Sequence, residues 1–156
     1  MQQTQLWRFA VTLWRDRGIE RACLRLQDEF AVPVAAVLVA LWAATSGRRP
    51  DAALGRRILI TAEQFEGEYL RPLREVRRRA AAGQGTGELK RQIQEAELEG
   101  ERLLLQQLGA LAGAAPASGE AQSTLGWLLV VVPDAARCEA LQALLNELSE
   151  NPALSG

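Results

Sequence analysis

A long apolar run extends from Val32 to Ala44, and it limits how the rest of the sequence can fold. Every residue from Val34 to Ala44 is apolar, so a helix here needs neighbours on all its sides. The run is shorter than the ~20 residues that a membrane-spanning helix needs. Val34–Val39 alone could form a buried strand, but the length of the run and its alanines favour a helix. We therefore expect a buried central helix, with Pro33 in its first turn.

Amphipathic helices are predicted before this run, because apolar residues recur there every three or four positions. Leu6, Phe9 and Leu13 mark the first helix, and Gly18 is expected to end it in a left-handed cap. A second helix follows directly, and one of its faces is apolar. The inward residues expected on this face are Ile19, Ala22, Cys23, Leu26 and Phe30.

After the central run, Asp51 is expected to cap a short helix from Ala52 to about Ile60. Thr61 and Gln64 have the spacing of a capping box, which predicts that another helix starts there. Pro72 should interrupt or kink that helix, because proline lacks the backbone N–H and its ring clashes with the preceding turn.

The second half of the chain contains the longest predicted helix, from Glu88 to about Leu111, after a flexible break at Gly83–Gly87. Its nearly heptad spacing predicts a long antiparallel neighbour or a short coiled coil. Trp127–Val132 is predicted to be a short helix or docking segment, and Asp134 should cap a final amphipathic helix. The expected seam of the long helix is Leu89, Ile93, Ala96, Leu103, Leu104, Leu108 and Leu111.

These patterns predict an all-α fold: a single compact helical domain of six to eight helices around a central all-apolar helix. At 156 residues, one domain is the default. Residues 1–112 are expected to form the helical core, and the Ala/Gly/Ser/Pro-rich residues 113–124 a flexible linker. Residues 125–156 are expected to be a C-terminal helical segment docked on the core.

The composition removes most of the groups that perform catalysis near neutral pH. The chain has no histidine, and Cys23 and Cys138 are its two cysteines. We therefore expect no enzyme, no cofactor and no metal. An all-carboxylate, Mg²⁺-dependent enzyme is the remaining catalytic alternative. The formal net charge of -1 implies no general attraction to nucleic acid or to anionic membranes.

One local stretch is strongly basic. Arg71, Arg74 and Arg78 are spaced to share one helix face, and they form the candidate binding surface. These arginines could pair with the glutamates of residues 95–101 on the next predicted helix. They could also meet an acidic protein partner, or the phosphates of nucleic acid or of a phosphorylated ligand.

Several separated segments resemble a family of small helical proteobacterial proteins of unknown function whose members open with Leu-Trp-x-Phe-Ala. The resemblance covers roughly residues 5–110, and it implies an intracellular bacterial protein without implying an activity. Trp7, Arg8, Gln27 and Asp28 form the candidate signature cluster, which would line a site if the signature marks one. The segments that carry the resemblance are Leu6–Ala10, Cys23–Asp28, Leu41–Trp42, Arg71–Arg74 and Ala96–Glu99.

The function predicted from these observations is that of a cytoplasmic, non-enzymatic adaptor or regulator that acts through its helix faces. Its partner is expected to be an unidentified protein or a second copy of the chain, with no role for a membrane. The main alternative is an arginine-mediated binder of nucleic acid or of a phosphorylated ligand.

Overall fold

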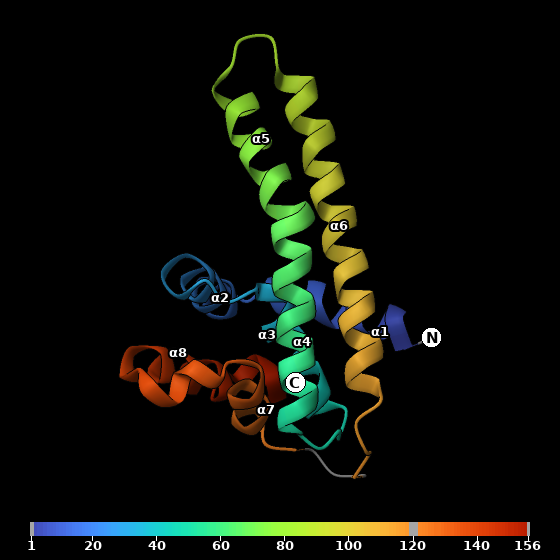
Figure 1. Ribbon diagram of the computed structural model, residues 1–156, viewed down its shortest axis with the longest axis vertical. Helices are drawn as coiled ribbons and strands as arrows, with labels where there is room; N and C mark the ends of the chain where they lie inside the picture. The colour runs from blue at the N-terminus through green and yellow to red at the C-terminus, as the bar shows by residue number, and fades with distance from the viewer. Residues whose placement is uncertain (1, 119–121, 156) are drawn as a thin grey trace.

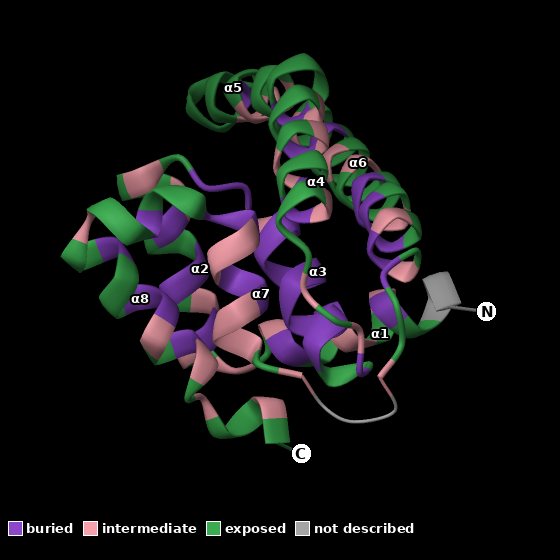
Figure 2. Cartoon of the chain, turned by 60° about the horizontal axis from the view of Figure 1, so that its bottom comes forward, coloured by how far each residue is buried: buried purple, intermediate pink, exposed green. Residues whose placement is uncertain are grey.

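Helix α3 (Val34–Thr45) lies at the centre of the fold in a computed structural model that describes residues 2–118 and 122–155. Its residues from Ala35 to Ala44 are all buried, and buried residues also surround it in Figure 2. The described residues form helices and no strand, apart from an isolated bridge between Arg48 and Ala117. The predicted all-α fold and its central apolar helix are therefore confirmed. Pro33 precedes the helix as its N-cap and lies outside its first turn.

Helices α1 (Gln2–Trp14) and α2 (Arg17–Phe30) are joined by a tight turn at Asp16. The Asp16 carboxylate accepts the Ile19 N–H at 3.0 Å and so caps α2. The prediction that Gly18 caps the first helix is wrong, because Gly18 already belongs to α2. The left-handed residue of this region is Ala31, with φ 54°, which ends α2.

Helix α4 (Ala52–Phe65) continues through a π-helical turn (Glu66–Leu70) directly into α5 (Arg71–Ala82). Asp51 caps α4 as predicted, accepting the Leu54 N–H at 2.8 Å. The prediction that a new helix starts at Thr61 is wrong. A capping box needs a chain that enters from a non-helical conformation, whereas Thr61 lies inside α4.

The π turn explains how the helix passes Pro72. The Arg71 N–H donates to the Glu66 carbonyl five residues back, which widens the turn just before the proline. Pro72 then lies in the first turn of α5, where a missing N–H is tolerated. The wider turn thus accommodates Pro72, and the helix continues past it into α5.

Helices α5 and α6 (Gly87–Gly113) form an antiparallel hairpin that projects from the rest of the molecule (Figure 1). We call residues 71–98 the arm, and we call the rest of the described chain, including the second half of α6, the base. Inside the arm, Ala80 and Ile93 are buried. Leu89 and Leu103 are 50% and 39% exposed, and Ala96 is exposed as well, so the predicted seam of α6 is wrong at these three positions. In the arm, α6 is buried on one face only. In the base, α6 is buried over a wider surface, which includes Leu105.

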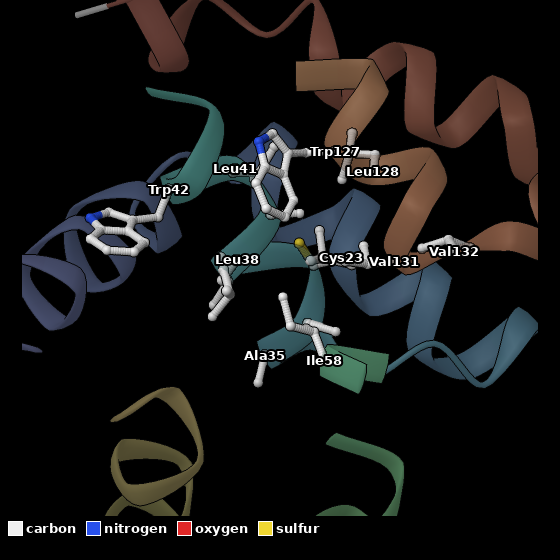
Figure 3. Close-up of a cluster of buried hydrophobic side chains, with 14 of the residues drawn as sticks. Cys23, Ala35, Leu38, Leu41, Trp42, Ile58, Trp127, Leu128, Val131 and Val132 are labelled. Carbon is white, nitrogen blue, oxygen red and sulfur yellow. The ribbon is translucent and has the colours of Figure 1, made fainter. Parts of the chain in front are cut away.

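The C-terminal helices pack on the base. Helix α7 (Thr124–Val131) is the predicted short helix, and it contacts α3 and α4. Trp127 is fully buried, and its indole Nε1–H donates to the Arg48 carbonyl at 2.7 Å. Figure 3 shows Trp127 beside Leu41 of α3, and Val131 beside Cys23 of α2. On α4, a Cβ at Gly55 would lie 2.4 Å from the Val130 carbonyl oxygen, so the two helices approach closely.

The last helix, α8 (Glu139–Ser149), follows a 3₁₀ turn at Pro133–Arg137. The prediction that Asp134 caps the final helix is wrong, since Asp134 lies in that turn and Cys138 precedes α8. A second 3₁₀ turn, Pro152–Ser155, ends the described chain. The division into residues 1–112, 113–124 and 125–156 stays a prediction, and residues 119–121 lie outside the described residues. As expected of an amphipathic helix, α8 has one buried face, which consists of Leu141, Leu144, Leu145 and Leu148.

Candidate functional site

A groove in two parts lies where the arm meets the base. Its apolar half is a cavity of about 280 Å³ between α1, α2, α3, the π turn, α5 and α6. Trp7 and Trp14 of α1 are half-buried in its lining, and Leu38 of α3 also lines it. A concave apolar surface with a few polar groups is the usual form of a binding site.

Exposed apolar side chains surround the apolar half. Val11 of α1, Leu24 of α2 and Leu98 of α6 are 40%, 38% and 54% exposed, and all three line the cavity. Single exposed apolar residues are ordinary on a protein surface, but a group of them around one hollow indicates an interaction site.

The polar half of the groove brings together residues that are far apart in the sequence. It is a cavity of about 520 Å³. Gln27 and Asp28 of α2 line it together with Arg71, Arg74 and Arg78 of α5. The fold therefore unites most of the candidate signature cluster with the candidate arginine surface.

The two halves meet at Glu66 and Arg74, which line both. Glu66 is a buried polar residue of the π turn, and its Oε2 lies 3.5 Å from Arg74 Nη1. In the amide orientation that satisfies both partners, the Gln27 oxygen accepts from Arg74 Nη1 and Nη2, each at 3.2 Å. Arg74 thus connects α2, the π turn and α5, which is a structural role.

The other arginines of α5 are placed differently. Arg77 Nε lies 2.6 Å from Glu97 Oε2 and so connects α5 to α6. Arg71 and Arg78 are exposed, and neither has an ion pair within residues 2–118 and 122–155. Among the described residues, none of Arg71, Arg74 and Arg78 forms an ion pair with the glutamates of residues 95–101, and the pair that joins α5 to α6 is Arg77–Glu97. Two further glutamates pair within α6 itself, in the pairs Arg91–Glu95 and Arg102–Glu99.

Glu101 is the site residue that sequence reasoning missed as an individual. It lines the apolar half of the groove, next to Leu98 and Leu105 of the same helix. Partial burial raises the pKa of its carboxyl, and the nearby Arg74 opposes this effect. The residue as a whole is still exposed, so its carboxyl belongs to the edge of the groove. A solvated glutamate face and a groove edge have the same sequence spacing, and only the packing distinguishes them.

The other two residues of the candidate signature cluster, Arg8 and Asp28, are exposed to solvent. Arg8 is exposed and lines neither half of the groove as the described residues define it. Asp28 is exposed in the polar half, and its neighbour Arg25 pairs with Glu29 at 3.2 Å. Of the tryptophans, Trp42 and Trp127 are buried, whereas Trp7 and Trp14 are half-buried.

The chemistry of the remaining groups is limited. Burial raises the pKa of the Cys23 thiol to about 12, which removes its nucleophilic form at neutral pH. In the described part of the chain, no three His, Cys, Asp or Glu side chains lie close enough to hold a metal ion. No described helix has the length and apolar composition needed to cross a bilayer.

Comparison with known proteins gives one match. A family model described as "Protein of unknown function (DUF2390)" matches residues 5–108. No curated protein and no solved structure matches the chain. The matched segment ends within α6 and includes every residue that lines either half of the groove.

Proposed function

The chain belongs to this family of proteins of unknown function, and we propose that it is a non-enzymatic adaptor or regulator that receives a helix of a partner protein in its groove. An amphipathic helix binds by placing its apolar face in a hydrophobic groove, with its polar face toward charged edges. The groove described above has both an apolar half and a charged half.

One observation carries this proposal. Val11, Leu24 and Leu98 come from three different helices, and they leave apolar surface exposed around a single cavity. A partner helix would bury this surface, and the free energy gained is about 25 cal/mol for each Å² of apolar area removed from water. The half-buried Trp7 and Trp14 would add large, rigid contact surfaces of the kind that dominates binding energy in interfaces.

The test is a site-directed photo-crosslink in cells that express the protein. A benzophenone amino acid replaces Leu98 in the groove or, as the control, Ile60 of α4, which is 43% exposed and does not line the groove. We expect the probe at position 98 to label one helical segment of a defined protein, which mass spectrometry identifies. The label should survive nuclease treatment and be lost in a Val11→Ser variant. Equal labelling from both positions, or labelling of nucleic acid alone, would contradict the proposal.

An arginine-mediated binder of polyanions is the second candidate, and the exposed Arg71 and Arg78 favour it. Against it, the lining of the polar half balances its charges, which weakens attraction to phosphates. A salt-sensitive affinity for a single-stranded oligonucleotide, lost in the Arg71→Ala/Arg78→Ala variant, would favour this candidate. The charged lining residues are Arg71, Arg74, Arg77 and Arg78 with Asp28, Glu63, Glu66 and Glu75.

A further inference from the structure

A cluster of charged residues beside the groove, which consists of Glu66, Arg74, Arg77, Glu97 and Glu101, holds one more acid than base. Glu66 pairs with Arg74 at 3.5 Å, and Glu97 pairs with Arg77 at 2.6 Å. Glu101 interacts electrostatically with all four of these groups but has no ion pair of its own among the described residues. With three carboxylates and two guanidinium groups, the cluster has a formal charge of −1.

We propose that the helix received by the groove is basic, and that one of its lysine or arginine side chains pairs with Glu101. This inference rests on the proposed function, because it assigns the charge of the partner that the same groove receives. The occupant is thus a basic amphipathic helix of another protein.

The position of Glu101 suits such a helix. Leu98 and Leu105 lie one turn before and one turn after Glu101 on α6, and all three line the apolar half. A partner helix that packs its apolar side chains on these two leucines places some of its other side chains next to Glu101. A lysine or arginine can lay its aliphatic stem on the apolar surface while its charged end reaches the carboxylate.

An acidic helix would fit this place poorly. Arg74 already binds Glu66 and Gln27, and Arg77 already binds Glu97. An incoming carboxylate over the apolar half would therefore meet Glu101 without a free cation beside it, and like charges across an interface are unfavourable. Arg71 and Arg78 do not line this half.

The half-buried tryptophans favour the same partner. Trp7 and Trp14 line the cavity that Glu101 also lines. The face of an indole ring attracts a cation electrostatically, so a basic side chain gains from both the rings and the carboxylate. The raised pKa of Glu101 agrees with a carboxyl that has lost part of its hydration and has no cation of its own.

The test compares two labelled helical peptides with the same leucine pattern, one with lysines and one with glutamates on the polar face. Fluorescence anisotropy measures their affinity for the full chain and for Glu101→Gln. Glu139→Gln, an exposed change on α8, is the control with the same change of net charge. We expect the lysine peptide to bind more tightly, Glu101→Gln to weaken it about fivefold, and Glu139→Gln to leave it unchanged. The glutamate peptide should not lose affinity in Glu101→Gln.

A Val11→Ser/Leu98→Ser variant separates the two proposals. If it abolishes binding of both peptides and Glu101→Gln changes neither, the groove receives helices but the charge assignment is overturned. If neither peptide binds, or this variant binds both normally, the proposed function fails as well. Light scattering covers the remaining occupant: a dimer of the chain that dissociates in this variant would show that a second copy fills the groove, and it would overturn both proposals. Circular dichroism confirms that each variant is folded.

Discussion

The carboxylate of Glu101 is partly shielded from water by the surrounding protein. Glu66, close by, is more buried, but Arg74 lies against it. The desolvation of the Glu101 carboxyl outweighs its attraction to Arg74 and Arg77, so its ionised form is less favourable in the folded protein than in the unfolded chain. Residues that oppose stability in this way are frequent at functional sites.

The pH dependence of stability checks this view of Glu101. Because the folded-state pKa is raised above the usual 4.5, the folded protein holds this proton more tightly than the unfolded chain does. The contribution of Glu101 to the free energy of unfolding therefore falls as pH rises from about 4.5 through the folded-state pKa. We expect Glu101→Gln to gain stability relative to the unmodified chain over this window. Urea unfolding at a series of pH values measures it, and a relative stability that declines with rising pH would contradict the prediction.

At the same scale, many of the groove residues could be identified from the sequence, but the contacts between them could not. Trp7 and Gln27 were indicated by the family resemblance, and Arg74 by the spacing of the arginines along one helix face. The contact between Gln27 and Arg74 depends on the position of α2 against α5, which no local pattern encodes. Arg8 was selected with them because it lies beside Trp7, yet adjacent helix residues point in different directions, and Arg8 is exposed outside the groove.

At the scale of single helices, prediction succeeded where one face packs on a continuous core. The inward residues of α8 and the enclosed α3 follow from periodicity and from apolar length. Prediction failed where the outcome of a sequence pattern depends on the segment that precedes it or packs against it. The capping pattern at Thr61 is overridden by the helix that enters it, and Leu89 is exposed because the projecting arm has no second layer to cover it.

The contact between α4 and α7 gives a prediction at the element scale. A Gly55→Ala change would place a methyl group 2.4 Å from the Val130 carbonyl oxygen, so the helices must separate. We expect a loss of about 1–3 kcal/mol in the free energy of unfolding, measured by urea titration with tryptophan fluorescence. Gly87→Ala is the control, since its Cβ would meet nothing within 4 Å. A Gly55→Ala protein as stable as this control would show that α7 is not docked on α4.

At the scale of the whole molecule, the arm and the base differ in how much they bury. Figure 2 shows mostly exposed residues along α5 and the adjoining part of α6, whereas the base surrounds a continuous core. Local opening is easiest where few apolar side chains are buried. The arm should therefore open without unfolding of α3.

Hydrogen exchange tests this division. Ile93→Ala removes a buried side chain of the arm, a change that typically costs about 2–5 kcal/mol. We expect amides of the arm, residues 71–98, to exchange faster while those of α3 keep their rates. The control, Leu89→Ala, alters a half-exposed position and should change little. Equal acceleration in the arm and in α3 would mean that the molecule opens as one unit.

The π turn at Glu66–Leu70 sets the direction in which everything after it faces. Each residue of an α-helix advances the chain by about 100° around the axis. If the same residues wound as a plain α-helix, α5 would be rotated by about that angle relative to α4, because a π turn takes up one extra residue without turning the chain further. Arg74 would swing away from Glu66, and Ala80 would turn away from α6. Losing one residue from this turn, such as Gly67, would instead leave a plain α-helix with the arm facing as it does now.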